Sequence, residues 1–152
     1  MFGFWILNTA QILLYCEEKM DKRDLVKLLP KDKFDIASIG KLNELNDSEF
    51  EFLMPDLFAW MADINWPIAF PIVELLSGKP HKIMSAIKGY LRRGEEDDEL
   101  KYNIILFLIP KLPSDVQKDL LGEIKRIYDE PSDIEKVGSW EAASSFMDEY
   151  NF

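Results

Sequence analysis

The side chains that most often perform nucleophilic or metal chemistry are scarce in this chain. It has one histidine, His81, and one cysteine, Cys16. His81 stands between Pro80 and Lys82, and we interpret it as a solvated residue near a helix start rather than as a catalytic one. The chain therefore offers few residues from which a Ser-His-Asp or Cys-His-Asn triad could form. The sequence predicts no catalytic residue.

The motifs of the common metal and phosphate sites do not occur in the sequence. It contains no HExxH pair, no glycine-rich phosphate loop and no EF-hand loop. A lone cysteine and a lone histidine cannot form a thiolate or histidine metal cluster within one chain. We therefore expect no metal and no cofactor. The 28 acidic residues leave a carboxylate-based enzyme as an alternative, although carboxylates at this density pair by chance.

The strongest local feature is the segment Trp60-Met-Ala-Asp63-Ile-Asn65-Trp66-Pro67, in which two tryptophans bracket a polar turn. In a structural interpretation, Asp63 and Asn65 satisfy free backbone groups at a junction between helices and the tryptophans pack the corner. In a functional interpretation, the same aromatic residues anchor a ligand or a partner. The structural interpretation is favoured, and Trp60, Asp63, Asn65 and Trp66 are kept as candidate binding residues.

Apolar residues recur at helical spacing along most of the chain from residue 25 onward, which predicts amphipathic helices. The clearest stripes are Ile36, Ile39, Leu42 and Leu45; Ile83, Ile87, Tyr90 and Leu91; Val116, Leu120, Ile124 and Ile127; and Ile134, Val137, Trp140 and Met147. Proline and glycine fall singly between the stripes. We expect an all-α protein with about seven or eight helices of modest length, in which short connections make consecutive helices antiparallel neighbours.

Three capping-box patterns predict three helix starts. In each pattern a serine is followed three residues later by Glu or Gln, so that the two side chains can satisfy backbone N–H groups reciprocally. The pairs are Ser48 with Glu51, Ser114 with Gln117, and Ser132 with Glu135.

The apolar run 104–109 (IILFLI) is compatible with either a buried strand or a buried helix. Three features favour the helix: acidic residues precede the run, no pair of turn residues follows it, and the sequence has no second β-branched run with which a strand could pair. A helix that is hydrophobic on all sides is expected at the centre of the fold.

Residues 2–16 are apolar and nearly uncharged. They lack the positive region and cleavage site of a signal peptide and are too short for a transmembrane helix. We interpret residues 1–19 as a packed helix, or as an extension upstream of a start at Met20. Residues 20–152 are predicted to form one helical-repeat domain.

Several motifs resemble a bacterial family known as a domain of unknown function, DUF family 5071. The resemblance is most specific over residues 53–76, which include the Trp60–Pro67 segment, and extends to Leu-Leu-Pro-Lys-Asp at 28–32. A second family motif, Trp-Lys-Tyr-Trp, reads Leu-Lys-Tyr-Asn at 100–103. Both tryptophans are replaced, so only Lys101 and Tyr102 are carried over as candidate binding residues.

The resemblance covers about residues 22–145 and implies a HEAT-like α-helical fold, a stack of antiparallel helix pairs. It leaves residues 1–19 outside the family domain and implies no activity. Faint similarity between the segments that follow Pro30 and Pro113 agrees with a repeat architecture.

The net charge of −10 makes nucleic acid and anionic membranes poor partners and a basic protein a better one. We predict a non-enzymatic protein-binding module in the cytoplasm, by analogy with immunity proteins that neutralise a basic toxin. The alternative is a small-molecule binder or a carboxylate-based enzyme in which Asp63, Asn65, Lys101 and Tyr102 converge on one pocket. Self-association through the N-terminal apolar segment is a third hypothesis.

Overall fold

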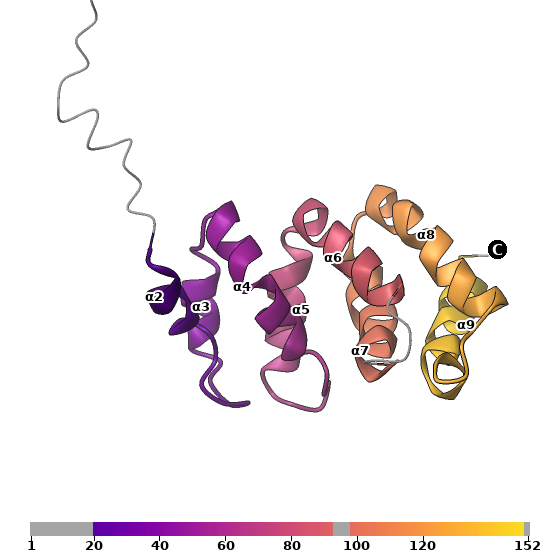
Figure 1. Ribbon diagram of the computed structural model, residues 1–152, viewed down its shortest axis with the longest axis horizontal. Helices are drawn as coiled ribbons and strands as arrows, with labels where there is room; N and C mark the ends of the chain where they lie inside the picture. Colours follow the sequence, from indigo (N-terminus) through magenta and orange to yellow (C-terminus); the bar gives the residue numbers. More distant parts are fainter. Residues whose placement is uncertain (1–19, 93–97, 151–152) are drawn as a thin grey trace, which may run out of the picture.

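The computed structural model describes residues 20–92 and 98–150, and in these residues all regular secondary structure is helical (Figure 1). The α-helices are α2 (Lys22–Val26), α3 (Ser38–Leu42), α4 (Asp47–Ala59), α5 (Ala69–Ser77), α6 (Pro80–Arg92), α7 (Asp98–Asn103), α8 (Ser114–Asp129) and α9 (Ser139–Glu149). Shorter segments are the π-helix η1 (Ile104–Leu108) and the 3-10 helices η2 (Ile109–Lys111) and η3 (Glu135–Val137). These eight α-helices confirm the predicted all-α class. The helix predicted within residues 2–16 lies outside the described residues.

The helices follow one another in chain order along the long axis and form two rows (Figure 1). One row contains α4, α6 and α8, since α6 contacts both α4 and α8. The other row contains α3, α5, η1 with α7, and α9, each in contact with the next. The pair α8 and α9 stands at the end of both rows, so one side of this pair has no further described helix against it.

The start of α4 shows how a polar side chain sets a helix boundary. Asn46 has extended backbone angles, and its side chain accepts a hydrogen bond of 3.0 Å from the backbone N–H of Glu49. The carboxylate of Glu49 in turn accepts a hydrogen bond from the backbone N–H of Asn46 (3.1 Å). The predicted capping box at Ser48 and Glu51 is therefore wrong by two residues, because the amide of Asn46 occupies the cap position first.

The two later capping boxes have opposite outcomes. Helix α8 begins at Ser114, but no side chain caps it, and the Gln117 amide donates to the carbonyl of Leu112 instead (2.7 Å). At the third site the predicted reciprocal bonds are confirmed: Ser132 N–H donates to the Glu135 carboxylate and Glu135 N–H donates to the Ser132 hydroxyl. This box opens the short segment η3 rather than a long helix.

The apolar run 104–109 is helical, as predicted, and continues α7 through η1 into η2. Four of its six side chains are buried, namely Ile104, Ile105, Leu108 and Ile109. The prediction that the run is buried on all sides is wrong for Phe107, which is partly exposed. Its ring packs edge-on against Phe70 at a centroid distance of 5.6 Å.

One hydrophobic cluster extends from Leu25 in α2 to Met147 in α9. The side chains of Phe50 and Phe58 in α4 are completely buried in it. Within the described ranges, no helix combines the length and the hydrophobicity that crossing a bilayer requires.

Candidate functional site

The Trp60–Pro67 segment connects α4 to α5. The rings of Trp60 and Trp66 meet edge to face at a centroid distance of 5.5 Å. The Asp63 carboxylate accepts hydrogen bonds from the backbone N–H of Asn65 (3.0 Å) and from its side-chain amide (3.3 Å). These contacts lie within the segment itself, as expected for an aspartate that shapes a tight turn.

A residue that sequence reasoning did not select holds this turn from outside. The buried amide of Asn103, at the end of α7, donates hydrogen bonds of 2.9 Å to the carbonyls of both Met61 and Ala62. Asn103 replaces the second tryptophan of the family motif, and this replacement put a role for the position in doubt. The sequence does contain a signal for such a role: a single amide residue directly precedes an apolar run, and a buried polar group needs hydrogen-bond partners.

Lys101 is 1% exposed, and its ammonium group lies 2.7 Å from the Glu135 carboxylate. Tyr102 is partly buried and lies near Gly138, at the start of α9. The bonds of Asp63 and Asn65 lie in the α4–α5 turn, whereas Lys101 contacts Glu135 in η3 and Tyr102 lies near Gly138, just before α9. The convergence of these four side chains on one pocket stays a prediction.

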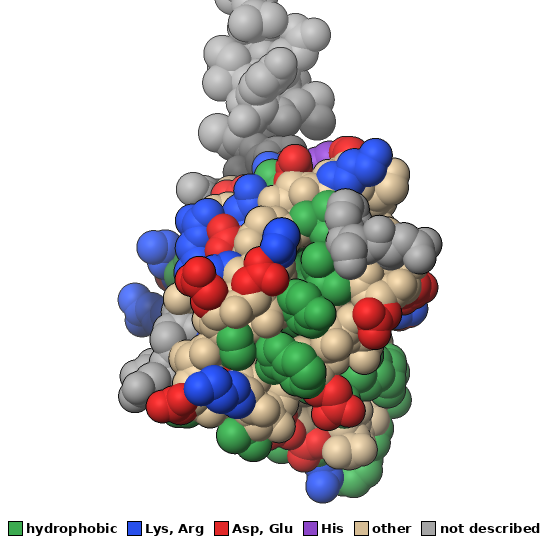
Figure 2. Space-filling view, turned by 90° about the vertical axis from the view of Figure 1, so that its right-hand side faces the viewer, with side chains coloured by type: hydrophobic (Ala, Val, Ile, Leu, Met, Phe, Trp, Pro, Cys, Tyr) green, Lys and Arg blue, Asp and Glu red, His purple; other side chains and the backbone are tan. Residues whose placement is uncertain are grey.

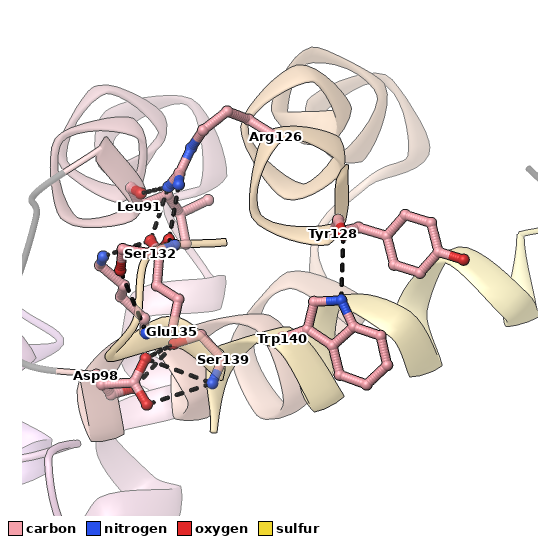
Figure 3. A network of polar contacts seen from close by, with 9 residues as sticks. Leu91, Asp98, Arg126, Tyr128, Ser132, Glu135, Ser139 and Trp140 are labelled. Atoms are coloured by element: carbon pink, nitrogen blue, oxygen red, sulfur yellow. Dashed lines mark hydrogen bonds and ion pairs between the residues drawn. The ribbon is translucent and has the colours of Figure 1, made fainter. Parts of the chain in front are cut away.

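Glu135 is the centre of a buried charged network (Figure 3). Arg126 donates two hydrogen bonds to its carboxylate, at 2.7 and 2.8 Å, and Lys101 donates a third at 2.7 Å. The backbone N–H of Ser132 donates a fourth at 2.9 Å. Arg126 also donates to the Leu91 carbonyl of α6 (2.8 Å). The network therefore joins α6, α7, α8 and η3.

The electrostatics of this network favour the ionised carboxylate. Burial by itself would raise the pKa of Glu135, but the hydrogen bonds from Arg126, Lys101 and Ser132 outweigh burial and lower the pKa to about 2. The same hydrogen bonds to Glu135 raise the pKa of Arg126 above its usual value. Glu135 and Arg126 are thus held in their charged forms, and their arrangement stabilises the fold.

Helix α9 receives its cap from a distant residue. The Asp98 carboxylate, at the start of α7, accepts hydrogen bonds from the backbone N–H of Ser139 (3.3 and 3.4 Å) and from its hydroxyl group. An anion at a helix N-terminus also interacts favourably with the helix dipole. A Cβ atom added to Gly138 would lie 2.7 Å from Asp98 Oδ2, so glycine permits this approach.

The outer side of the final helix pair carries an apolar surface, which we call the terminal face: Leu121, Tyr128, Trp140 and Tyr150. Phe146 is 3% exposed and belongs to the core, and its ring stacks on that of Tyr150. Figure 2 views this end of the molecule and shows hydrophobic side chains gathered in a band across it. Tyr128, Trp140 and Tyr150 are 39%, 40% and 37% exposed, which is high for such large side chains. Aromatic residues that remain this exposed are typical of contact surfaces.

The two aromatic rings at one end of the terminal face are held in place. The Trp140 indole N–H donates a hydrogen bond of 3.1 Å to the Tyr128 carbonyl, and the rings of the two residues are nearly parallel, with an angle of 7° between them (Figure 3). The other end contains a depression of about 130 Å³ lined by Ser114, Gln117, Lys118, Leu121, Phe146 and Tyr150.

Acidic side chains are frequent on the same two helices and in the loop between them. In the part of the chain that the structure describes, Glu141, Asp148 and Glu149 are exposed and form no ion pair, whereas the exposed Glu130 interacts electrostatically with Arg126. The neighbouring Asp129 and Asp133 are paired with Lys125 and Lys136. The helix that carries Trp140 therefore has an excess of unpaired negative charge.

A comparison with models of protein families assigns the chain to a family. The family model described as Domain of unknown function (DUF5071) matches residues 28–145. The chain belongs to this family. The match confirms the resemblance drawn from the Trp60–Pro67 segment and begins six residues later than predicted. No curated protein matched the chain.

The DUF5071 match includes the α4–α5 turn, the Glu135 network and the Tyr128–Trp140 pair, but it ends before Phe146 and Tyr150. Within residues 20–92 and 98–150 of this DUF5071 protein, no group of three or more His, Cys, Asp or Glu side chains could hold a metal ion.

A second depression in this DUF5071 protein, of about 490 Å³, lies between α4 and α6 and includes Met54, Phe58, Ala86 and Tyr90 in its lining. The charged groups at one end of it neutralise one another, since Lys82 contacts both Asp47 (3.1 Å) and Glu51 (3.3 Å).

Proposed function

We propose that this protein is a non-enzymatic binding module and that it binds a basic protein through the terminal face. The observation that carries this proposal is the combination of Tyr128 and Trp140, both about two-fifths exposed, with the carboxylate of Glu141, which follows Trp140 and forms no ion pair among the described residues. Aromatic anchors surrounded by a charged rim are the usual anatomy of a protein–protein interface.

The helix arrangement supports this reading. We infer a HEAT-like stack of antiparallel helix pairs, in which each pair buries its apolar side against the next one. In such a stack the outer side of a terminal pair is normally polar, because no further repeat covers it. An apolar outer side on α8 and α9 instead fits a surface that a partner covers.

Charge indicates the kind of partner. The chain carries a net charge of −10, and within the described residues Glu141, Asp148 and Glu149 of α9 form no ion pair. A basic partner would gain both long-range attraction and local pairing. Neutralisation of a basic toxin in the manner of an immunity protein is the specific role that we propose. The single cysteine fits a reducing compartment, and we place the encounter in the cytoplasm.

Site-specific photo-cross-linking in cells that make the protein tests this function. A photoreactive phenylalanine analogue would replace Tyr128 and, as a matched control, Phe34, which is 67% exposed but lies in the loop between α2 and α3. We expect the Tyr128 position to yield one cross-linked protein of net positive charge. The purified partner should then bind the wild-type protein, and this binding should weaken strongly in about 0.5 M NaCl and on Trp140→Ala.

The proposal is wrong if the Tyr128 position cross-links nothing, or only a second copy of this chain, while the folded protein is abundant. It is equally wrong if the Phe34 position captures the same partner and Trp140→Ala leaves the affinity for it unchanged.

A further inference from the structure

We propose that the occupant of the terminal face is a basic amphipathic helix of the partner, which lies along α8 and presents an aliphatic side chain and an arginine seven residues apart. This inference rests on the proposed function and specifies the form of the partner. Three features of the face support it: a small apolar depression, a fixed aromatic pair, and the distance between them along α8.

The depression at one end of the face can accept one aliphatic side chain. Its volume is about 130 Å³, and Leu121, Phe146 and Tyr150 supply its apolar lining. Two of the polar side chains that line it are already engaged, since the Tyr150 hydroxyl bonds the Gln117 amide oxygen and the Gln117 nitrogen donates to the Leu112 carbonyl. The ammonium group of Lys118, which also lines the depression, would repel a cation there, so the depression favours an uncharged, apolar residue.

The aromatic pair at the other end suits a guanidinium group. The Trp140 ring cannot rotate freely, because its N–H is bonded to the Tyr128 carbonyl and its plane is parallel to the Tyr128 ring. A flat cation can stack on an exposed aromatic surface of this kind. The carboxylate of Glu141, which forms no ion pair among the described residues, directly follows Trp140 in the sequence and is available to accept hydrogen bonds from the N–H groups of that cation. Arginine combines stacking with two-pronged hydrogen bonding to a carboxylate, whereas lysine offers only a point charge.

The spacing between these two ends matches a helix. Leu121 and Tyr128 are seven residues apart in the same α-helix, so they lie on one side of α8 and are separated by two turns, roughly 10 Å. A partner helix running alongside α8 repeats that spacing at its own positions i and i+7. Every inner helix of this fold packs against another helix in its own row, so a partner helix would continue the arrangement beyond the last described helices.

Charge disfavours a second copy of this chain as the occupant. A two-fold symmetric contact through the terminal face would bring Glu130, Glu141, Asp148 and Glu149 of one copy near the same four residues of the other. Like charges opposed in this way weaken association, whereas a basic helix relieves them.

Synthetic helices provide the test. The probe is an alanine- and lysine-based peptide of about 18 residues, with one leucine and one arginine seven positions apart. One comparison peptide has the same composition with these two residues five positions apart, which places them on different sides of the helix. A second has lysine in place of arginine. Isothermal titration gives the affinities, and the Trp140 indole N–H resonance in a ¹⁵N-correlated spectrum locates the binding.

We expect the seven-spaced peptide to bind at least about tenfold more tightly than the five-spaced one and to shift the Trp140 indole resonance. Leu121→Ser and Trp140→Ala should each weaken binding by about tenfold, while Phe34→Ser should have no effect. The advantage of arginine over lysine should disappear in Trp140→Ala, because the stacking surface is then absent. Thermal melting of each variant checks that it remains folded.

Equal affinity for the two spacings, or an arginine preference that survives in Trp140→Ala, would overturn the inference. So would binding that leaves the Trp140 resonance unmoved. If cross-linking at Tyr128 captures a basic partner but the peptides show none of the expected differences, the helix inference fails while the proposed function stands. If both experiments fail, the proposed function is wrong as well.

Discussion

Arg126 binds Glu135 through two parallel hydrogen bonds, of 2.7 and 2.8 Å, and this pair joins the end of α8 to the segment before α9. The carboxylate is 1% exposed, whereas the Arg126 side chain is 35% exposed. Lys101 reaches the same carboxylate from α7. Two cations thus share one buried carboxylate, which makes Glu135 the most sensitive point of the network.

Replacing Glu135 with glutamine should destabilise the fold strongly. The substitution keeps the shape but removes the negative charge that Lys101 and Arg126 contact, and breaking a buried pair in this way costs about 3 kcal/mol or more. Urea denaturation followed by circular dichroism measures the change in the free energy of unfolding. Glu44→Gln is the matched control, because Glu44 is exposed and forms no ion pair within the described residues. A loss as small as that of the control would contradict the role given to the network.

The low pKa of Glu135 predicts how stability depends on pH. The pKa in the folded protein is about 2, against an ordinary value of 4.5. The unfolded chain therefore takes up the proton first, and the stabilisation is fully present above pH 4.5 and is lost as the pH falls toward 2. The free energy of unfolding, measured in urea at several pH values in this window, should fall more steeply for the wild type than for Glu135→Gln. Parallel curves for the two proteins would show that another group causes the acid sensitivity.

Asn103 should prove necessary for the turn between α4 and α5. Asn103→Leu keeps the branched shape of the side chain but removes the two donors to the carbonyls of Met61 and Ala62. Buried acceptors left without donors cost about 1–3 kcal/mol. We expect a lower melting temperature, together with a change in near-ultraviolet circular dichroism from the Trp60–Trp66 contact. A variant with wild-type stability and an unchanged tryptophan signal would show that the turn holds without Asn103.

Two glycine substitutions should have opposite effects on stability. Gly138→Ala places a Cβ atom 2.7 Å from Asp98 Oδ2, so the carboxylate must move and its cap on α9 weakens, at a cost of about 1 kcal/mol. Gly122→Ala lies inside α8 with no neighbouring atom within 4 Å and should stabilise the protein by about 0.5–1 kcal/mol, because alanine favours the helix. Thermal denaturation of both variants distinguishes the two effects. The same sign for both would contradict the interpretation of Gly138.

Local interactions explain which features could be predicted from the sequence. Helical periodicity depends on residues three and four positions apart, so the stripe containing Val116, Leu120 and Ile124 predicts its helix without knowledge of its neighbours. The reciprocal bonds of Ser132 and Glu135 were predictable for the same reason, because the two residues are three positions apart. The capping box predicted at Ser114 does not form, because the Gln117 amide donates to the Leu112 carbonyl, which precedes the helix. The sequence alone cannot decide which of two nearby hydrogen-bond partners a side chain takes.

The amino-acid sequence by itself determined the helical class, the approximate number of helices, the scarcity of histidine and thiol chemistry and the membership of the DUF5071 family, because each depends on composition, short-range spacing or motif. The tertiary structure decided which polar residues meet. Asp98 lies 41 residues from Ser139, Lys101 lies 34 residues from Glu135, and Asn103 lies 42 residues from Met61. It also decided that the outer side of α8 and α9 stays exposed while similar apolar stripes elsewhere are buried, since burial depends on which helices are neighbours in space.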